Sequence, residues 1–339
     1  MCDSTVKASG STSSTVKSSK TASFSRLIDE DGVVGVTSTP TIFQKAIGGS
    51  DDYDAAIQHV LDPEPYAIFE HLAIDDIQHA CDLFRPVYDR TNGRDGYVSL
   101  EVSPLIANDS ATTRSEALRL FAAVNRPVRD DQDSGDGSGH PGNRRSDCGG
   151  RERERDADLR GGELPAGGGG VHPRAGAAQG SGAGREQVAS VASFFLSRID
   201  VMVDRMLTDD SLKGKTAIAN AKVAYKQFKQ MFYGERFAAL KAAGAQVQRV
   251  LAGVDRDRGQ RAGHDVRRRV DQASTVNTLP PETLTLFKDP GTMAATLEQG
   301  IEEAERTLAK LAGAGVDLND VTRRLQIDGV ASFSGHSRS

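Results

Sequence analysis

The sequence lacks the features that mark several large classes of protein. Its 339 residues contain no tryptophan and only three cysteines, Cys2, Cys81 and Cys148. Three cysteines without metal-type spacing argue against a disulfide framework or a metal site, and they fit a reducing cytoplasm. No apolar run reaches membrane-spanning length, and residues 1–20 lack the apolar core of an export signal, so we expect no membrane partner. The net charge of −5 gives the chain no overall attraction to nucleic acid.

Aromatic residues are also absent from one long internal stretch. Residues 127–186 contain no Phe or Tyr but hold 16 of the chain's 35 glycines. Because such a sequence cannot bury a core, we predict disorder over 128–186. The Ser/Thr/Lys-rich residues 1–25 and the charged residues 251–274 likewise show no hydrophobic periodicity. The remaining blocks, which we expect to be ordered, are 26–127, 187–250 and 275–339.

Strand-loop-helix units fill these ordered blocks. Val98, Leu100 and Val102 alternate as in a strand, and an amphipathic helix capped by Thr112 or Thr113 follows. We expect further strands at 33–37, 187–196, 245–251 and 275–279, and helices at 51–61, 66–88 with a possible break near Ala73, 197–209, 216–231, 235–243 and 293–311. Repeated units of this kind favour a (β/α) barrel or a doubly wound sheet.

Five motifs in the ordered blocks add a family resemblance. They read GVVGVTSTPTIFQKAI, DGYVSLEVSP, SVASFFLSRID, IANAKVAY and VNTLPPET, in that order along the chain. By these motifs the chain resembles transaldolase, the class I aldolase of the pentose phosphate pathway. The resemblance implies an α/β fold, a single (β/α)8 TIM barrel, which we expect to be incomplete here. It also implies transfer of dihydroxyacetone from sedoheptulose 7-phosphate to glyceraldehyde 3-phosphate through a lysine Schiff base, with no metal or organic cofactor.

The resemblance also gives roles to five residues. Glu101 matches the family glutamate that acts through a water on the imine, and Ser193 and Arg198 match phosphate-binding positions. Phe195 matches an aromatic residue lining the site, whereas Thr39 stands where the family usually has Asn, so an amide contact to substrate is lost. The planar guanidinium group of an arginine can donate two hydrogen bonds to phosphate oxygens at once, which suits Arg198 to this role. From the residues alone plainer readings stay open: a solvated strand glutamate, an exposed helix arginine and a core phenylalanine.

The Schiff-base lysine itself is missing from the chain. In the family it lies in a strand reading IKIP, and synonymous codons for residues 128–155, displaced by one base, can also read VMIKIPATEAGIPAIEEAIAAGVNVN. The lysine codon then straddles Gln132 and Asp133, and in the other displaced frame the family's proton-transferring aspartate straddles Ser11 and Thr12. We therefore interpret residues 1–25, 128–186 and 251–274 as out-of-frame translations, and we predict that this chain is inactive.

Two alternatives remain beside this reading. One is an enzyme similar to fructose 6-phosphate aldolase, although the long C-terminal half and the order of the motifs favour transfer. The other is a non-catalytic protein whose Gly/Arg-rich segment binds nucleic acid. Acidic residues interrupt those arginines and no aromatic residues accompany them, so we do not expect nucleic acid as a partner. The resemblance implies sugar phosphates as the partners.

Overall fold

In the part of the chain that the structure describes, eight parallel strands form the centre, in the order β5-β4-β3-β2-β1-β8-β7-β6. The computed structural model describes residues 4–7, 24–60, 64–126, 129–133, 152–155, 189–242, 245–253, 274–279 and 296–336. The strands are β1 (Ser4–Lys7), β2 (Val33–Thr37), β3 (Val98–Glu101), β4 (Arg129–Asp133), β5 (Glu152–Arg155), β6 (Val191–Phe195), β7 (Arg249–Gly253) and β8 (Thr275–Leu279). The predicted α/β class with a parallel sheet is thereby confirmed.

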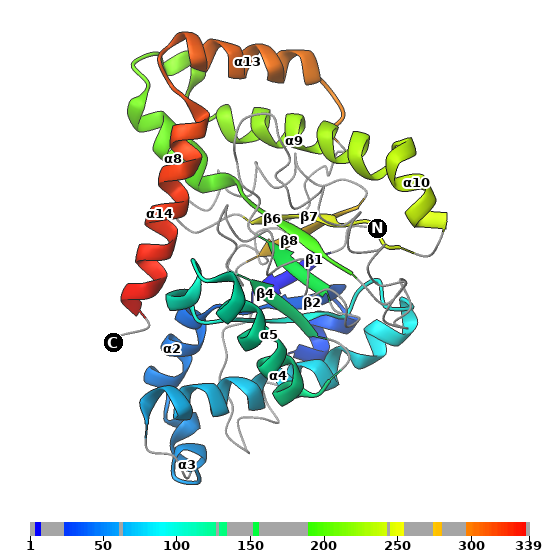
Figure 1. Cartoon of the computed structure of the whole chain (residues 1–339), viewed down its shortest axis with the longest axis vertical. Coiled ribbons are helices and arrows are strands. Elements are labelled where there is room, and N and C mark those ends of the chain that lie inside the picture. Colours follow the sequence, from blue (N-terminus) through cyan, green and yellow to red (C-terminus); the bar gives the residue numbers. More distant parts are fainter. Residues whose placement is uncertain are drawn as a thin grey trace.

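Helices cover the strands on two sides (Figure 1). On one side lie α2 (Pro40–Gly48), α3 (Asp54–Ile57), α4 (Pro65–Arg90) and α5 (Ser110–Val124). On the other lie α8 (Leu196–Met206), α9 (Thr216–Phe232), α10 (Glu235–Ala242) and α13 (Ile301–Gly313), and α14 (Leu318–His336) runs along one end between the two groups. Among the described residues no helix combines the length and the apolar character needed to cross a membrane.

Each group of helices packs on the sheet through its own apolar core. Val98 of β3 is fully buried together with Phe84 of α4 and Val124 of α5. On the other side, Phe194 of β6 packs with Phe228 of α9 and others of its cluster. Each large apolar side chain buried in this way contributes about 1.5–3 kcal/mol. The helical and strand periodicities of the ordered blocks therefore produce an apolar cluster between the strands and the helices on each side.

The sheet is curled. Asp95, just before β3, and Arg249, the first residue of β7, form an ion pair of 2.6 Å between Oδ1 and Nη1. Three strands, β2, β1 and β8, lie between β3 and β7. In a flat sheet the two strands would be roughly 19 Å apart, four times the strand spacing, which these side chains cannot bridge. Of the described strands, the outermost ones, β5 and β6, lie side by side without a hydrogen-bonded ladder between them.

Several predicted boundaries are wrong, each for a local reason. Helix α4 continues through Ala73, which is buried and helix-favouring, so the possible break there is absent. The cap of α5 is neither Thr112 nor Thr113, because the Asp109 carboxylate accepts the N–H of residues 111 and 112. Helix α13 begins at Ile301, later than expected, after a glycine with φ of +62°.

Three short strands lie wholly within the stretches predicted to be out of frame, and residues 251–253 of β7 fall within the third stretch, 251–274. Strand β1 lies within residues 1–25, and β4 and β5 lie within 128–186. Ladder hydrogen bonds use only the main chain, so polar sequences can extend a parallel sheet when a neighbouring strand offers an edge. Most of the three stretches lies outside the described residues.

Candidate active site at the carboxyl edge of the sheet

All described strands run in the same direction, so their carboxyl ends share one edge of the sheet, where parallel α/β proteins place their chemistry. Four of the five predicted site residues lie at strand ends or in the segments that follow them along this edge, and Ser193 lies in the middle of its strand. Glu101 ends β3 and is partly exposed, and Thr39 follows β2 as the N-cap of α2. Ser193 and Phe195 lie in β6, and Arg198 lies in the first turn of α8. The side chain of Phe195 is outside the described part of the chain.

A pair of serines joins the two segments that carry Thr39 and Glu101. The Ser38 N–H donates to the Ser99 Oγ at 3.0 Å, and the Ser38 Oγ donates to the Ser99 carbonyl at 2.6 Å. Both serines are buried, so water does not compete with these bonds. Since Ser38 precedes Thr39 and Ser99 lies two residues before Glu101, the bonds fix the loop after β2 against the end of β3. The Thr39 side chain makes no capping hydrogen bond, so α2 does not hold its hydroxyl.

Ser193 and Arg198 form a second group, on the β6–α8 unit. Ser193 is buried in the middle of β6, and Arg198 is partly buried. Two carboxylates close to Arg198 in sequence accept backbone N–H groups: Asp200 Oδ1 from Ala217 at 2.8 Å and Asp204 Oδ1 from Gly214 at 2.9 Å. These bonds attach α8 to the start of α9. They therefore hold the segment that carries Arg198 in one position.

Helix α14 lies against both groups. It contacts α2 and the 3₁₀ helix η2 (Pro104–Ile106), which follow β2 and β3, and it also contacts α8. Figure 1 shows this helix running from α8 toward α2. At Gly329 an added Cβ would stand 3.8 Å from Nη1 of Arg198, so α14 passes next to the guanidinium. The last helix thus connects the segments that carry Thr39, Glu101 and Arg198.

The strands beside Glu101 carry no amine. The backbone register pairs Glu101 of β3 with Gln132 of β4, and Gln132 with Glu154 of β5. Among the eight described strands the one lysine is Lys7, the last residue of β1, which pairs in register with Thr37. Within the described residues no group of three or more His, Cys, Asp or Glu side chains could hold a metal ion. The predicted site residues with described side chains therefore supply the Glu101 carboxylate, the hydroxyls of Thr39 and Ser193, and the Arg198 guanidinium.

Sequence reasoning missed two contacts that shape this region. The Ser38–Ser99 bonds join residues 61 positions apart, and the Asp95–Arg249 pair joins residues 154 positions apart. Neither pair has a local sequence signal, because each depends on how the strands are arranged in the sheet.

Comparison with known proteins gives one consistent result. The family model described as Transaldolase/Fructose-6-phosphate aldolase matches residues 15–130 and 174–338. A transaldolase of Thiobacillus denitrificans is 37% identical over 335 residues, covering 91% of this chain and 88% of the relative. A transaldolase of Trichodesmium erythraeum is 34% identical over 336 residues, covering 91% and 86%. Transaldolase 2 of a Nostoc species is 35% identical over 342 residues, with the same coverage of 91% and 86%.

Proposed function

The chain belongs to the transaldolase/fructose-6-phosphate aldolase family of enzymes, and from that premise we propose that its gene encodes a transaldolase of the cytoplasmic pentose phosphate pathway. The reaction moves a dihydroxyacetone unit from sedoheptulose 7-phosphate to glyceraldehyde 3-phosphate. The relatives named transaldolase, matching nine-tenths of the chain, carry this proposal. The fold that goes with it is a (β/α)8 barrel, which the eight parallel strands and the curl of the sheet support.

The proposed chemistry proceeds through a lysine imine. The amine adds to the ketose carbonyl and water leaves; breaking the neighbouring carbon–carbon bond then releases erythrose 4-phosphate. The remaining enamine attacks the aldehyde of glyceraldehyde 3-phosphate, and hydrolysis of the imine releases fructose 6-phosphate. Glu101 would relay protons through a water, while Ser193 and Arg198 hold the sugar phosphate and Phe195 lines the pocket. Thr39 would contact the sugar through a hydroxyl where the family has an amide.

We further infer that this polypeptide does not turn over, because its lysine strand was translated out of frame. Gln132 takes the place of the lysine. Its register with Glu101 supports this assignment, since the amine and the glutamate must act on the same imine. The family match also breaks over residues 131–173, inside the proposed displaced segment 128–186. A glutamine amide is not nucleophilic, so no imine forms at this position.

Reductive trapping tests the proposal. The purified chain is incubated with fructose 6-phosphate and sodium borohydride, and its intact mass is measured. We expect no adduct on this chain, and one adduct on the product of the gene with all three frames restored, mapped to the lysine of IKIP. An adduct on the present chain, at Lys7 or any other lysine, would contradict the inferred inactivity. A matched control is the restored protein with that lysine replaced by arginine, which keeps the charge without the reactive amine.

A second candidate function is aldol cleavage of fructose 6-phosphate, which the description of the matching family also includes. The restored protein distinguishes the two. A transaldolase forms fructose 6-phosphate only when both sugar phosphates are present and releases little free dihydroxyacetone. An aldolase releases dihydroxyacetone from fructose 6-phosphate without an acceptor. Resequencing the DNA tests the frame displacement itself, because intact frames at 1–25, 128–186 and 251–274 would restore the enzyme.

A further inference from the structure

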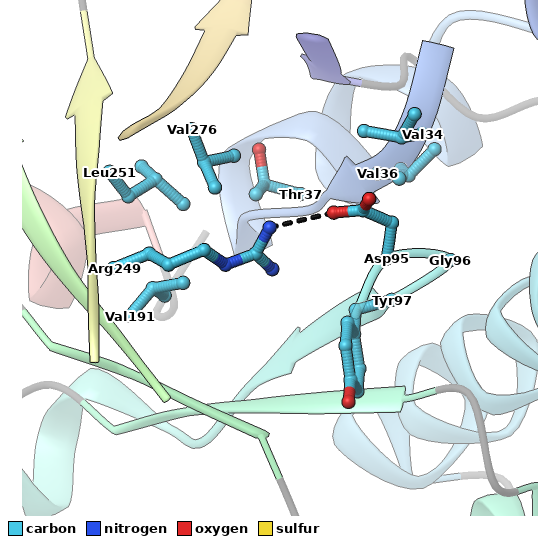
Figure 2. Close-up of a pocket in the computed structure, with 11 residues that line it drawn as sticks. Val34, Val36, Thr37, Asp95, Gly96, Tyr97, Val191, Arg249, Leu251 and Val276 are labelled. Atoms are coloured by element: carbon cyan, nitrogen blue, oxygen red, sulfur yellow. Dashed lines mark hydrogen bonds and ion pairs between the residues drawn. The ribbon is translucent and has the colours of Figure 1, made fainter. Parts of the chain in front are cut away.

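The ion pair between Asp95 and Arg249 is the most buried one in the described part of the chain. The Asp95 and Arg249 side chains are 6% and 11% exposed, and the pair spans 154 residues of sequence. Figure 2 shows the guanidinium reaching toward the carboxylate across a space between strands. The cavity there has a volume of only about 20 Å³, and its walls include Val191, Leu251 and Val276, which form an apolar cluster. The pair therefore lies inside the curled sheet and not on its surface.

Both partners are anchored through their backbones. The Asp95 N–H donates to the Oγ1 of Thr91, which itself donates to the Val87 carbonyl at the end of α4. The Arg249 N–H donates to the carbonyl of Ser190, the residue before β6. Because backbone hydrogen bonds hold both residues, the ion pair between them fixes α4 and β3 relative to β6 and β7.

The glycine that follows Asp95 explains how the carboxylate reaches this place. Gly96 has φ of +91°, and an added Cβ would stand 2.5 Å from the backbone nitrogen of Tyr88 in α4. Only glycine lets the chain pass so close to the helix in this conformation. The resulting turn leads Asp95 toward the interior, where its carboxylate meets Arg249.

The sheet has few other connections between these parts. In the described ladders, β2 and β3 are joined to β8, β7 and β6 only through β1, whose pairing with β2 shifts register between Ser4 and Val6. The other route around the sheet passes through β4 and β5 and lacks a ladder between β5 and β6 in the described residues. A contact directly across the interior bypasses both routes.

We infer that the Asp95–Arg249 pair is a strut that holds the sheet curled by fixing β3 against β7. The strut lies at the amino ends of the strands, opposite the carboxyl edge where Glu101 ends β3 and Phe195 ends β6. It sets the spacing of the two strand groups to which those residues belong. Buried ion pairs often add little net stability, so its effect is geometric specificity: a partner left alone would be a buried, uncompensated charge. The strut operates whether or not the chain is catalytically active.

Hydrogen exchange on the full-length chain tests the strut. Asp95→Ala and Arg249→Ala should each speed amide exchange about tenfold in peptides of both β3 and β7, because either change opens the same contact. Combining Asp95→Arg with Arg249→Asp should return exchange toward the original rate, as expected for a coupled pair. The matched control is Arg119→Ala, which removes an exposed ion pair between α4 and α5 and should leave β7 unchanged.

Faster exchange confined to the mutated strand would overturn the strut, since a local effect needs no contact across the interior. If the alanine variants do not fold, Asp95→Asn is measured, because it keeps the shape of the side chain and removes only the charge. Unchanged exchange in β7 of that variant would count against the proposal, and faster exchange in both strands would support it.

Discussion

Strands β3 and β4 are neighbours in register but differ completely in composition. β3 reads VSLE and β4 reads RDDQD, and their ladder pairs Val98 with Arg129 and Leu100 with Asp131. Val98 and Leu100 are buried in the core beneath α4 and α5. In a parallel ladder, paired residues take the same face of the sheet, so β4 has charged residues at positions where β3 has apolar ones.

This difference distinguishes the contribution of main-chain hydrogen bonds to the sheet from the contribution of buried side chains. Backbone hydrogen bonds can join any two extended segments, and β4 pairs with both β3 and β5. The stability of a parallel sheet comes from burying apolar side chains under its helices, and a charge on that face costs several kcal/mol. β3 therefore stabilises its own position, whereas β4 depends on its neighbours for its place in the sheet. The following experiments test that contrast.

Replacing the charges on one face of β4 should have the largest effect. The combined change Arg129→Val, Asp131→Ile and Asp133→Ile makes the face shared with Leu100 apolar. We expect the free energy of unfolding to rise by about 4 kcal/mol or more, since each buried apolar side chain contributes about 1.5–3 kcal/mol. Urea unfolding followed by circular dichroism measures the gain.

The control for this experiment lies on the opposite face of the same strand. Asp130 pairs in register with Ser99, which is also buried but lies on the face away from the core of α4 and α5, so Asp130→Val adds no side chain to that core and should yield a smaller gain than the triple change. An equal gain from both variants would mean that the two faces of β4 are equivalent, and the contrast with β3 would fail.

Truncating register partners should have a smaller effect that differs between the strands. Leu100→Ala removes a buried side chain and should cost about 2–5 kcal/mol. Asp131→Ala, at the paired position in β4, should not lower the stability and should increase it, because it removes a charge from the face that β3 fills with apolar side chains. Urea unfolding measures both changes in the free energy of unfolding, which are calculated from the midpoints with one common dependence of that free energy on urea concentration. A comparable loss from Asp131→Ala would show that the charged residue contributes to the fold as much as the apolar one.

The elements that sequence reasoning predicted well are those whose signal is local. β2 and β8 have the predicted bounds, and α9 differs by one residue at its end, because apolar runs and helical spacing are properties of short segments. The cap of α5 was missed because Asp109 and Thr112 are both good capping residues and only the carboxylate reaches two N–H groups. The strut between Asp95 and Arg249 could not be predicted, since it depends on how the whole sheet curls.

The candidate site likewise contains some features that have a local sequence signal and others that depend on the arrangement of the strands. Glu101 and Arg198 were singled out by motifs, and the structure locates them at the carboxyl edge, but their roles stay predictions. The serine bonds that join Ser38 to Ser99 were invisible in the sequence, because strand order decides which hydroxyls meet. The strands β4 and β5 were not expected, because main-chain pairing leaves no mark in side-chain composition.

Ion pairs on the surface of helices α4 and α5 should contribute least to the free energy of unfolding. Arg119 of α5 donates to Glu70 of α4 and to Glu116, one turn earlier in its own helix. Since the Arg119 side chain is 48% exposed, Arg119→Ala should cost only about 0.5–1 kcal/mol, and 1 M salt should reduce that difference. Urea unfolding at low and high salt measures it.

The pH dependence of the same variant separates a surface pair from a structural charge. The hydrogen bond from Arg119 lowers the pKa of Glu116 below its ordinary value of 4.5. A lowered carboxyl pKa stabilises the fold above pH 4.5 and loses that effect as the pH falls through the folded pKa. The stability difference between the original chain and Arg119→Ala should therefore be full at neutral pH and shrink below pH 4.5. A difference that persists in acid would mean that Arg119 acts through packing of its apolar stem.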